Sequence, residues 1–250
     1  DATVAGLGPD GPAYRALVAP FAERWATFVR HVLDTPLRMP SDPLLMARFA
    51  PLALRPTTAL ARRFRTAEAR ALLAGNAAHS GTPLEDRLTG AIGATLMVAG
   101  HAVGWPVPRG GAGRLTEALA GYFASLGGTV ETGRSVESLS ELPACRATIL
   151  ALTLRQVGRL AGDRLAPAWR RACSAWRYGP GAFKVDWALD GPIPWQDERV
   201  LRAGTVHVGG TLEEIATSER AVEDGRVSER PFVLLAQPSV FDPTRAPEGR

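Results

Sequence analysis

Cysteine is scarce in this sequence, and its scarcity excludes two kinds of small-protein scaffold. Cys145 and Cys173 are the two cysteines among 250 residues. Two thiols cannot build a disulfide framework, and they cannot supply the four cysteine ligands of a structural zinc site. We therefore expect both to be free thiols that pack as small apolar side chains. A chain of this length is ample for a hydrophobic core of its own.

Lysine is nearly absent, although the chain is basic. Lys184 is the single lysine among 29 basic residues, and the formal net charge is +4. A nucleic-acid-binding face gathers basic residues into one patch or stripe. The arginines here alternate with acidic residues along the chain, so we expect no nucleic-acid partner. A weak attraction of the arginines to anionic lipid at a membrane surface stays open.

Long apolar runs are missing too. The longest apolar stretch, residues 91–103, has 13 residues, whereas a transmembrane helix needs about 20. It predicts a buried helix. The chain opens at Asp1 without the basic stretch of a signal peptide. We expect a cytoplasmic protein, with peripheral membrane association as an open alternative.

Several catalytic patterns are also absent. The sequence contains neither the G-x-S-x-G elbow of α/β-hydrolases nor a Walker phosphate-binding motif. His31, His79, His101 and His207 are isolated from other ligand residues along the chain, so we expect no metal site. His101 lies inside an expected helix, and we interpret it as a hydrogen-bonded core residue. No acid–base pair stands out, and no catalytic residue is assigned.

What is present first is helix. Apolar residues at spacings of three and four predict helices over the first 104 residues. The expected helices cover residues 12–34, 43–54, 66–77 and 82–103. They are rich in Ala and Leu and are linked by proline. Such helices could line an apolar cavity as well as fill a core, and the sequence leaves both possibilities open.

Beyond residue 104 the pattern changes to an alternation of short strands and helices, which is typical of an α/β layer. The expected strands are 129–132, 135–139, 147–152, 182–189, 204–208 and 232–237. The expected helices are 115–126, 154–160, 164–174 and 211–222. We therefore predict a mixed α/β fold with three regions. They are a helical region 1–104, an α/β region 105–163 and a mixed sheet and helix region 164–250.

Two glycine-rich segments are candidate ligand loops. Residues 6–11 match G-x-G-x-x-G, but no buried strand leads into them and no acid follows on a second strand. We interpret this match as a loop. Residues 108–114, with the sequence PRGGAGR, precede an expected helix whose N-terminus favours an anion or an electron-rich ring. A ligand loop and a plain entry into the helix are equally compatible with this spacing.

The second half of the chain resembles a known enzyme family. The resembling segments read GWPVPRGGAGRLTEALAGYFASLGGTVETGRSVESL and ATILALTLRQV. Further matching segments are YGPGAFKVDWALDGPIPW, GTVHVGGTLEEIA and PFVLLAQPSVFDPTRAPEGR. They resemble the phytoene-desaturase-like branch of the FAD-dependent amine-oxidase superfamily. The resemblance is most specific from residue 105 onward.

The resemblance implies a partial FAD/NAD(P)-binding type fold and a flavoprotein oxidoreductase with FAD as cofactor. The substrate would be apolar, such as an isoprenoid or a carotenoid, and would be oxidised by hydride transfer to the flavin. The N-terminal unit that binds the ADP part of FAD and the C-terminal segment that closes over the flavin are both missing. The resemblance therefore implies an internal fragment of a longer protein, with 1–104 covering the substrate, 105–163 as the middle of the FAD-binding domain and 164–250 as a truncated substrate domain.

The resemblance also implies cofactor-binding residues. Val136 would meet the adenine through its backbone, and Leu152 and Thr153 would form a strand end near the dinucleotide. Arg109, Gly110 and Gly111 would form a turn near the flavin or the substrate entrance. The alternative that the residues leave open is a non-enzymatic module that binds an apolar ligand or a membrane surface. The oligomeric state is not predicted.

Overall fold

The computed structural model describes residues 2–34 and 39–246. It groups the chain into two compact units, one made of residues 1–114 and 182–250, the other of residues 115–181. The three regions expected from the sequence, 1–104, 105–163 and 164–250, do not coincide with these units, and they stay a prediction about a longer protein.

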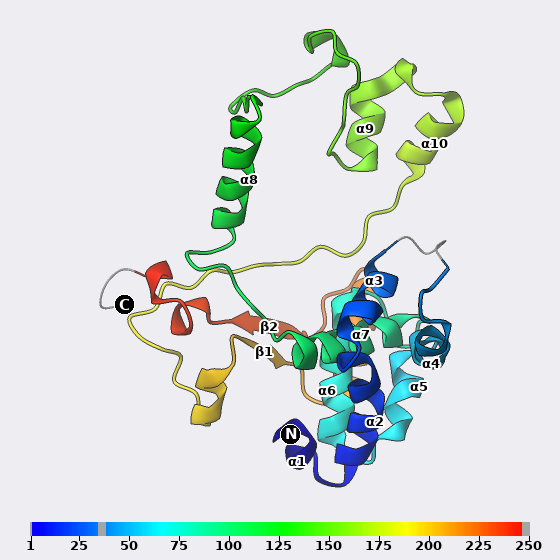
Figure 1. The fold of residues 1–250 in the computed structure, drawn as a ribbon, viewed down its shortest axis with the longest axis vertical. Coiled ribbons are helices and arrows are strands. Elements are labelled where there is room, and N and C mark those ends of the chain that lie inside the picture. The colour runs from blue at the N-terminus through cyan, green and yellow to red at the C-terminus, as the bar shows by residue number, and fades with distance from the viewer. Residues whose placement is uncertain (1, 35–38, 247–250) are drawn as a thin grey trace. The chain divides into compact units, whose positions relative to one another are not determined.

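The N-terminal part of the first unit is helical, as the apolar spacing predicts (Figure 1). Its helices are α1 (Ala2–Gly6), α2 (Gly11–Ala22), α3 (Trp25–Leu33), α4 (Pro43–Ala53), α5 (Thr57–Leu60), α6 (Ala67–Ala77) and α7 (Thr89–Ala102). Asp42 caps α4 by accepting a hydrogen bond from the Leu45 N–H at 3.0 Å. Thr66 caps α6 through the Ala69 N–H at 3.3 Å. Both caps follow from the preference of short polar side chains for helix N-termini.

Two helix boundaries differ from the prediction. The helix expected over residues 12–34 is two helices, because α2 ends at Ala22 and α3 begins at Trp25. The helix expected from residue 82 begins at Thr89, since Leu88 has a φ of 74° and cannot continue a right-handed helix. The capping-type sequence at 82–85 forms a turn in place of the expected helix start.

The helices fill their own core. Phe21, Phe28 and Phe49 pack ring against ring, with centroids 4.8 to 5.3 Å apart. Helices α6 and α7 approach each other closely at Gly93, where an added Cβ would lie 3.0 Å from the Ala77 Cβ. Of the two possibilities that the sequence leaves open for these helices, the structure shows the core, in which their apolar faces meet one another.

A small two-stranded antiparallel sheet and one helix complete the packing of the first unit. Strands β1 (Thr205–Val208) and β2 (Val233–Ala236) pair with Val206 opposite Leu235. Helix α11 (Leu212–Glu223) begins with a capping box between Thr211 and Glu214. The structure confirms the strands expected at 204–208 and 232–237 and the capping box. The apolar face of α11 joins the hydrophobic core of the helical part.

Four expected strands are absent from the structure. Residues 129–132, 135–139, 147–152 and 182–189 have no strand assignment. Their alternating or apolar patterns are suited to a sheet, but a strand forms only where a neighbour supplies hydrogen bonds. The structure is therefore α-rich, with helices over 56% of the described residues and a sheet of two strands among them. The α/β layer expected for 105–163 is not formed.

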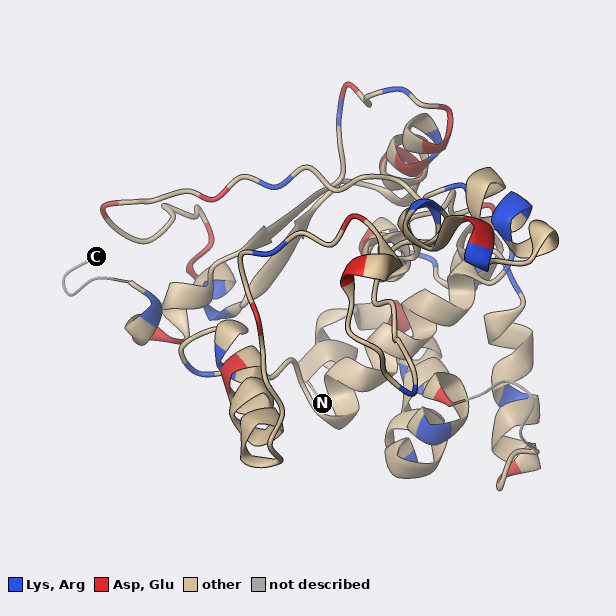
Figure 2. Cartoon of the chain, turned by 90° about the horizontal axis from the view of Figure 1, so that it is seen from above, with Lys and Arg blue, Asp and Glu red and all other residues tan. Residues whose placement is uncertain are grey.

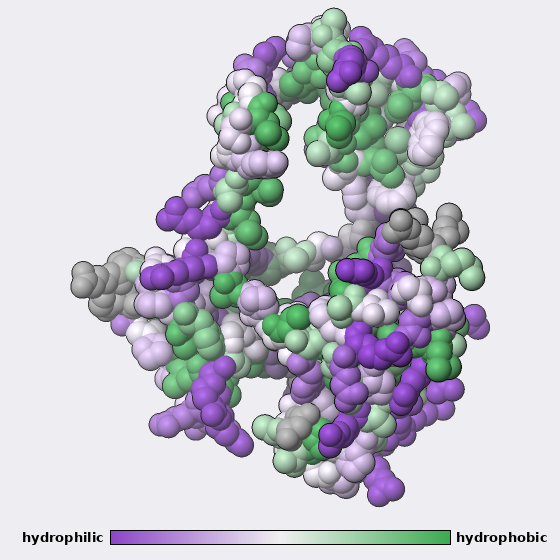
Figure 3. Space-filling model, viewed as in Figure 1, coloured by the Kyte–Doolittle hydropathy of each residue, from purple (hydrophilic) through white to green (hydrophobic). Residues whose placement is uncertain are grey.

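The second unit has few buried side chains. Its helices are α8 (Gly113–Ser125, which begins in the first unit), α9 (Leu154–Ala161) and α10 (Pro167–Ala175), close to the three expected ranges. Helices α9 and α10 pack together around Cys173, which is buried. Cys145 is exposed, contrary to the expectation that both thiols pack inside. Helix α8 buries none of its residues, and apolar surface is visible on it in Figure 3.

Basic and acidic residues are interspersed along the ribbon in Figure 2, as the sequence indicates. Among the described residues, no helix has both the length and the apolar character needed to cross a bilayer.

Candidate functional site

The glycine turn at residues 108–111 is a tight, left-handed turn. Gly110 and Gly111 have φ values of 78° and 94°. Glycine adopts such left-handed angles readily because it has no Cβ. The Gly111 N–H donates to the Pro108 carbonyl at 2.9 Å, and the chain then enters α8. Arg109 is exposed to solvent. The sequence located this turn correctly because its signal is local.

The structure adds a partner for this turn that the sequence does not reveal. The buried carboxylate of Asp242 accepts a hydrogen bond from the Gly110 N–H at 2.5 Å. Its other oxygen accepts from the hydroxyl and the backbone N–H of Thr244. These bonds, first the Thr244 hydroxyl and then the Gly110 N–H, lower the pKa of Asp242, and nearby Arg109 adds to the effect. The anion at this turn is thus the chain's own carboxylate.

The other expected cofactor residues belong to the second unit. Val136 is partly buried in an irregular extended segment, and Leu152 is exposed. Thr153 is the N-cap of α9, where it forms a capping box with Gln156. Its hydroxyl also lies 2.7 Å from the Tyr178 hydroxyl. A structural role as a helix cap therefore accounts for the contacts of Thr153.

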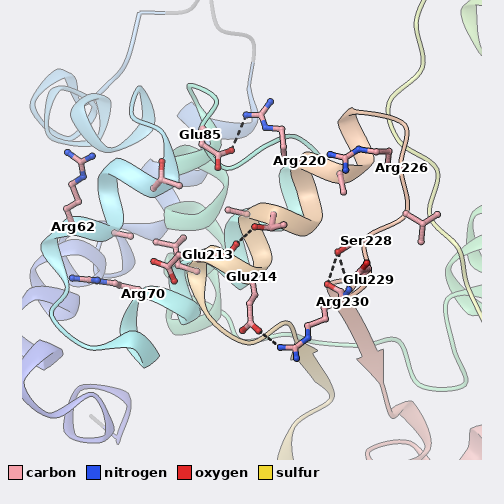
Figure 4. Close-up of a pocket in the computed structure, with 17 residues that line it drawn as sticks. Arg62, Arg70, Glu85, Glu213, Glu214, Arg220, Arg226, Ser228, Glu229 and Arg230 are labelled. Atoms are coloured by element: carbon pink, nitrogen blue, oxygen red, sulfur yellow. Dashed lines mark hydrogen bonds and ion pairs between the residues drawn. The ribbon is translucent and has the colours of Figure 1, made fainter.

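A groove in the first unit is the second candidate site, and the sequence does not predict it. It has a volume of about 1030 Å³ and lies between α11, helices α5 and α6, and the loop 226–230 (Figure 4). Apolar side chains of α11, including Leu212 and Ala216, line part of it. The charged side chains around it are Arg62, Arg70, Arg220, Arg226, Arg230, Glu85, Glu213, Glu214 and Glu229.

Four of these nine charged side chains form ion pairs with one another. Arg220 lies 3.1 Å from Glu85, and Arg230 lies 2.9 Å from Glu214. The N–H of Thr211 and then Arg230 lower the pKa of Glu214, although burial opposes the shift. Exposed ion pairs of this kind contribute roughly 0–1 kcal/mol each. Five guanidinium groups against four carboxylates leave little net charge, so the groove carries no strong preference for an anion.

The histidines are the largest departure from the sequence interpretation. His79, in the short 3₁₀ turn Ala78–Ser80 after α6, and His207 on β1 face each other with their Nε2 atoms 3.1 Å apart. Burial lowers the pKa of His207, and His79 lowers it further. The two residues are 128 positions apart in the sequence, and no local signal connects them.

His101 also differs from expectation. Its Nε2 lies 2.8 Å from the Tyr14 hydroxyl, so its side chain is satisfied. The residue itself is exposed, so the expectation of a core histidine is wrong. Burial raises the pKa of Tyr14 to about 12, so this phenol remains protonated at neutral pH.

No group of three or more His, Cys, Asp or Glu side chains within residues 2–34 and 39–246 is arranged to hold a metal ion. Comparison with protein-family models, with curated proteins and with solved structures gives no match to this chain.

Proposed function

We propose that the chain contributes the substrate-covering part and part of the flavin-binding domain of a FAD-dependent oxidoreductase. The full enzyme would oxidise an apolar substrate, such as an isoprenoid or a carotenoid, by hydride transfer. The resemblance of residues 105–250 to phytoene-desaturase-like enzymes suggests this family. One structural observation supports it most. Two of the segments that carry the resemblance, helix α8 and residues 182–189, keep their apolar side chains exposed.

Helix α8 is the clearest example. Its large apolar residues recur at helical spacing, which predicts a single apolar stripe. They are Leu115, Leu119, Tyr122, Phe123 and Leu126. All five are exposed, and Leu119 retains 70% of its accessible surface. Monomeric proteins rarely expose a contiguous apolar stripe without a partner for it. The stripe is what a helix covering a larger sheet would present.

The segment 182–189 repeats this observation with the period of a strand. Phe183, Val185, Trp187 and Leu189 alternate with less apolar residues. Phe183 is 96% exposed and Trp187 is 79% exposed. An alternating segment of this kind is suited to one half-buried face of a sheet. It would become a strand if a neighbouring strand were supplied by the rest of the proposed enzyme.

The residues present do not by themselves fit FAD. A dinucleotide phosphate is bound by free backbone N–H groups at a glycine-rich turn and a helix N-terminus. At the turn 108–111, however, the Gly110 N–H bonds to Asp242 and the Gly111 N–H bonds to Pro108. The phosphate site of the proposed enzyme would thus lie outside these residues, and no catalytic step is assigned to this chain.

The alternative function is a module that binds an apolar ligand or a membrane surface. The filled core of the N-terminal helices removes one reason for it, because these helices face one another. The exposed apolar stripe of α8 is compatible with both functions. The two proposals differ in a measurable property, since the oxidoreductase holds flavin and the module does not.

The test uses the product of the complete reading frame, purified after addition of FAD. We expect bound flavin with its visible absorption bands. Leu119→Asp should lower flavin occupancy, because the charge would enter a packed interface. Leu33→Asp is the matched control, since Leu33 is a helical leucine with 77% exposure in the N-terminal part.

A flavin-free complete product would refute the oxidoreductase proposal. Binding of that product to anionic vesicles would then favour the membrane-surface module. Equal loss of flavin in the two leucine variants would show that α8 has no special contact. The 250-residue chain alone should bind FAD poorly, because its glycine turn is already closed by Asp242.

A further inference from the structure

His79 and His207 lie side by side, and the function proposed above uses neither of them. Histidine is a common metal ligand. Both belong to the first unit, and their Nε2 atoms are 3.1 Å apart. Their ring centroids are 5.0 Å apart, with an angle of 51° between the ring planes. The same nitrogen atom of each ring therefore faces the other ring.

This spacing matches that of two ligands on one metal ion. Zinc binds histidine nitrogen at ~2.0–2.1 Å in tetrahedral geometry, so two such nitrogens lie about 3.3 Å apart. The ring centroids of the two ligands would then be separated by about 5 Å. Both values are close to those of the pair. A small adjustment of the two rings would give an ion the bond lengths that it needs.

The surroundings hold one ring in place and leave the other accessible. His207 is partly buried and packs edge-to-face against Phe232, with centroids 5.4 Å apart. On its other side lies α6, where a Cβ at Gly75 would come within 3.0 Å of the His207 Nδ1. His79 is exposed to solvent. An ion can thus reach the pair, and the fixed His207 ring would lose little freedom on binding it.

We propose that His79 and His207 form a two-histidine site for a divalent transition-metal ion. Imidazole suits zinc and copper, and copper(II) binds such ligands more tightly than zinc does. Water molecules would complete the coordination, because no third His, Cys, Asp or Glu joins the pair among the described residues. The ion would connect the end of α6 to β1 and so link the helical core to the two-stranded sheet.

The site is tested by titrating the untagged chain with zinc alone, in a buffer that does not bind metal. We expect saturable binding of one zinc ion per chain. His79→Ala and His207→Ala should each weaken this binding by more than about tenfold, since even an outer-shell partner of a metal ligand often contributes that much. His31→Ala is the control, because His31 bonds to Ser41 at a separate place.

A second readout separates the site from other zinc-binding groups. Zinc should raise the melting temperature of the chain and of His31→Ala, because binding to the folded state stabilises it. It should leave the melting temperature of His79→Ala unchanged. Because His79 is exposed, this variant is expected to retain the fold, and its circular dichroism spectrum checks that point.

Copper(II) gives the coordination directly. Its electron paramagnetic resonance spectrum should report two histidine nitrogens in the chain and fewer in His79→Ala. Absence of saturable zinc binding would overturn the proposal, as would equal affinity in the chain and in both histidine variants. Because none of these measurements involves flavin, the result is independent of the proposed oxidoreductase function.

Discussion

Truncation of Phe28 to alanine tests whether the helical part is held by its own core. Phe28 is fully buried in this unit. Its ring lies 4.8 Å from that of Phe49 and 5.1 Å from that of Phe21, centroid to centroid. A third ring, that of Trp25, lies 6.2 Å away. Removing Phe28 deletes these three aromatic contacts and leaves a cavity that neighbouring helices can fill only in part.

The expected cost follows from the area that this side chain removes from water. A buried phenylalanine covers about 150–250 Å². At about 25 cal/mol per Å², this area corresponds to roughly 4–6 kcal/mol. The denatured chain already buries part of its apolar surface, which makes that figure an upper bound. We therefore expect Phe28→Ala to lower the free energy of unfolding by about 3–5 kcal/mol, the range usual for such truncations.

Phe183→Ala is the matched control in the same chain. Phe183 is 96% exposed, so its removal deletes almost no packing. We expect its effect to stay within about 0.5 kcal/mol, as for other surface substitutions. Urea unfolding followed by far-ultraviolet circular dichroism measures both variants, with the slope of the transition checked for each.

The two unfolding free energies test the packing of each phenylalanine separately. A cost for Phe183→Ala as large as that for Phe28→Ala would refute the description of residues 182–189 as unpacked. A cost below about 1 kcal/mol for Phe28→Ala would refute the filled aromatic core, since even partial relaxation of a buried site leaves more than that. In the complete enzyme proposed above, Phe183→Ala should cost more than in this chain.

Three further predictions concern single positions. Gly90→Ala should destabilise the chain by about 1–3 kcal/mol in thermal melts, because its Cβ would lie 2.7 Å from two carbonyl oxygens. The control Gly121→Ala should be neutral or slightly stabilising, because the position lies in α8 with open space around it. Burial raises the pKa of Asp10, but hydrogen bonds from three donors, the Arg65 N–H and the Thr66 N–H and hydroxyl, outweigh it and lower the pKa below its usual value. The ionised carboxylate therefore stabilises the fold above about pH 4 and stops doing so as the pH falls through its lowered pKa, so a pH series of melts should be flatter for Asp10→Asn than for the parent chain, and equal slopes would contradict this. Asp242→Ala should speed hydrogen exchange at the Gly110 amide, measured by mass spectrometry, and unchanged exchange would mean that the carboxylate does not close the turn.

Local chemistry explains which parts of the fold could be predicted from the sequence. The start of α6 follows from Thr66, and the start of α11 follows from the capping box of Thr211 and Glu214. These signals lie within four residues of the feature they specify. The late start of α7 follows from the left-handed conformation of Leu88, and α2 ends at Ala22 before α3 begins at Trp25. The sequence contains no local signal for either boundary.

The same distinction applies to the candidate sites. The turn at Gly110 and Gly111 was predictable because glycine itself permits its geometry. Its partner Asp242 is 132 residues away, and the two histidines of the proposed metal site are 128 apart. Contacts over such separations are decided by how the helices pack, and a single sequence gives no pattern from which to infer them.

The strand predictions that the structure contradicts did not fail because the local sequence pattern is wrong for a strand. Residues 182–189 have the period of a strand, and the α8 stripe has the period of a helix with one buried face. Both patterns specify a partner as well as a conformation, because apolar side chains gain free energy only when they leave water. Helix α8 can form without a partner because its backbone hydrogen bonds lie within the helix. A strand cannot, because its backbone hydrogen bonds join it to a neighbouring strand. If these faces pack against the rest of the proposed enzyme, the absence of that partner would leave an exposed helix in one case and an irregular extended segment in the other. Helix α8 and residues 182–189 have these two forms.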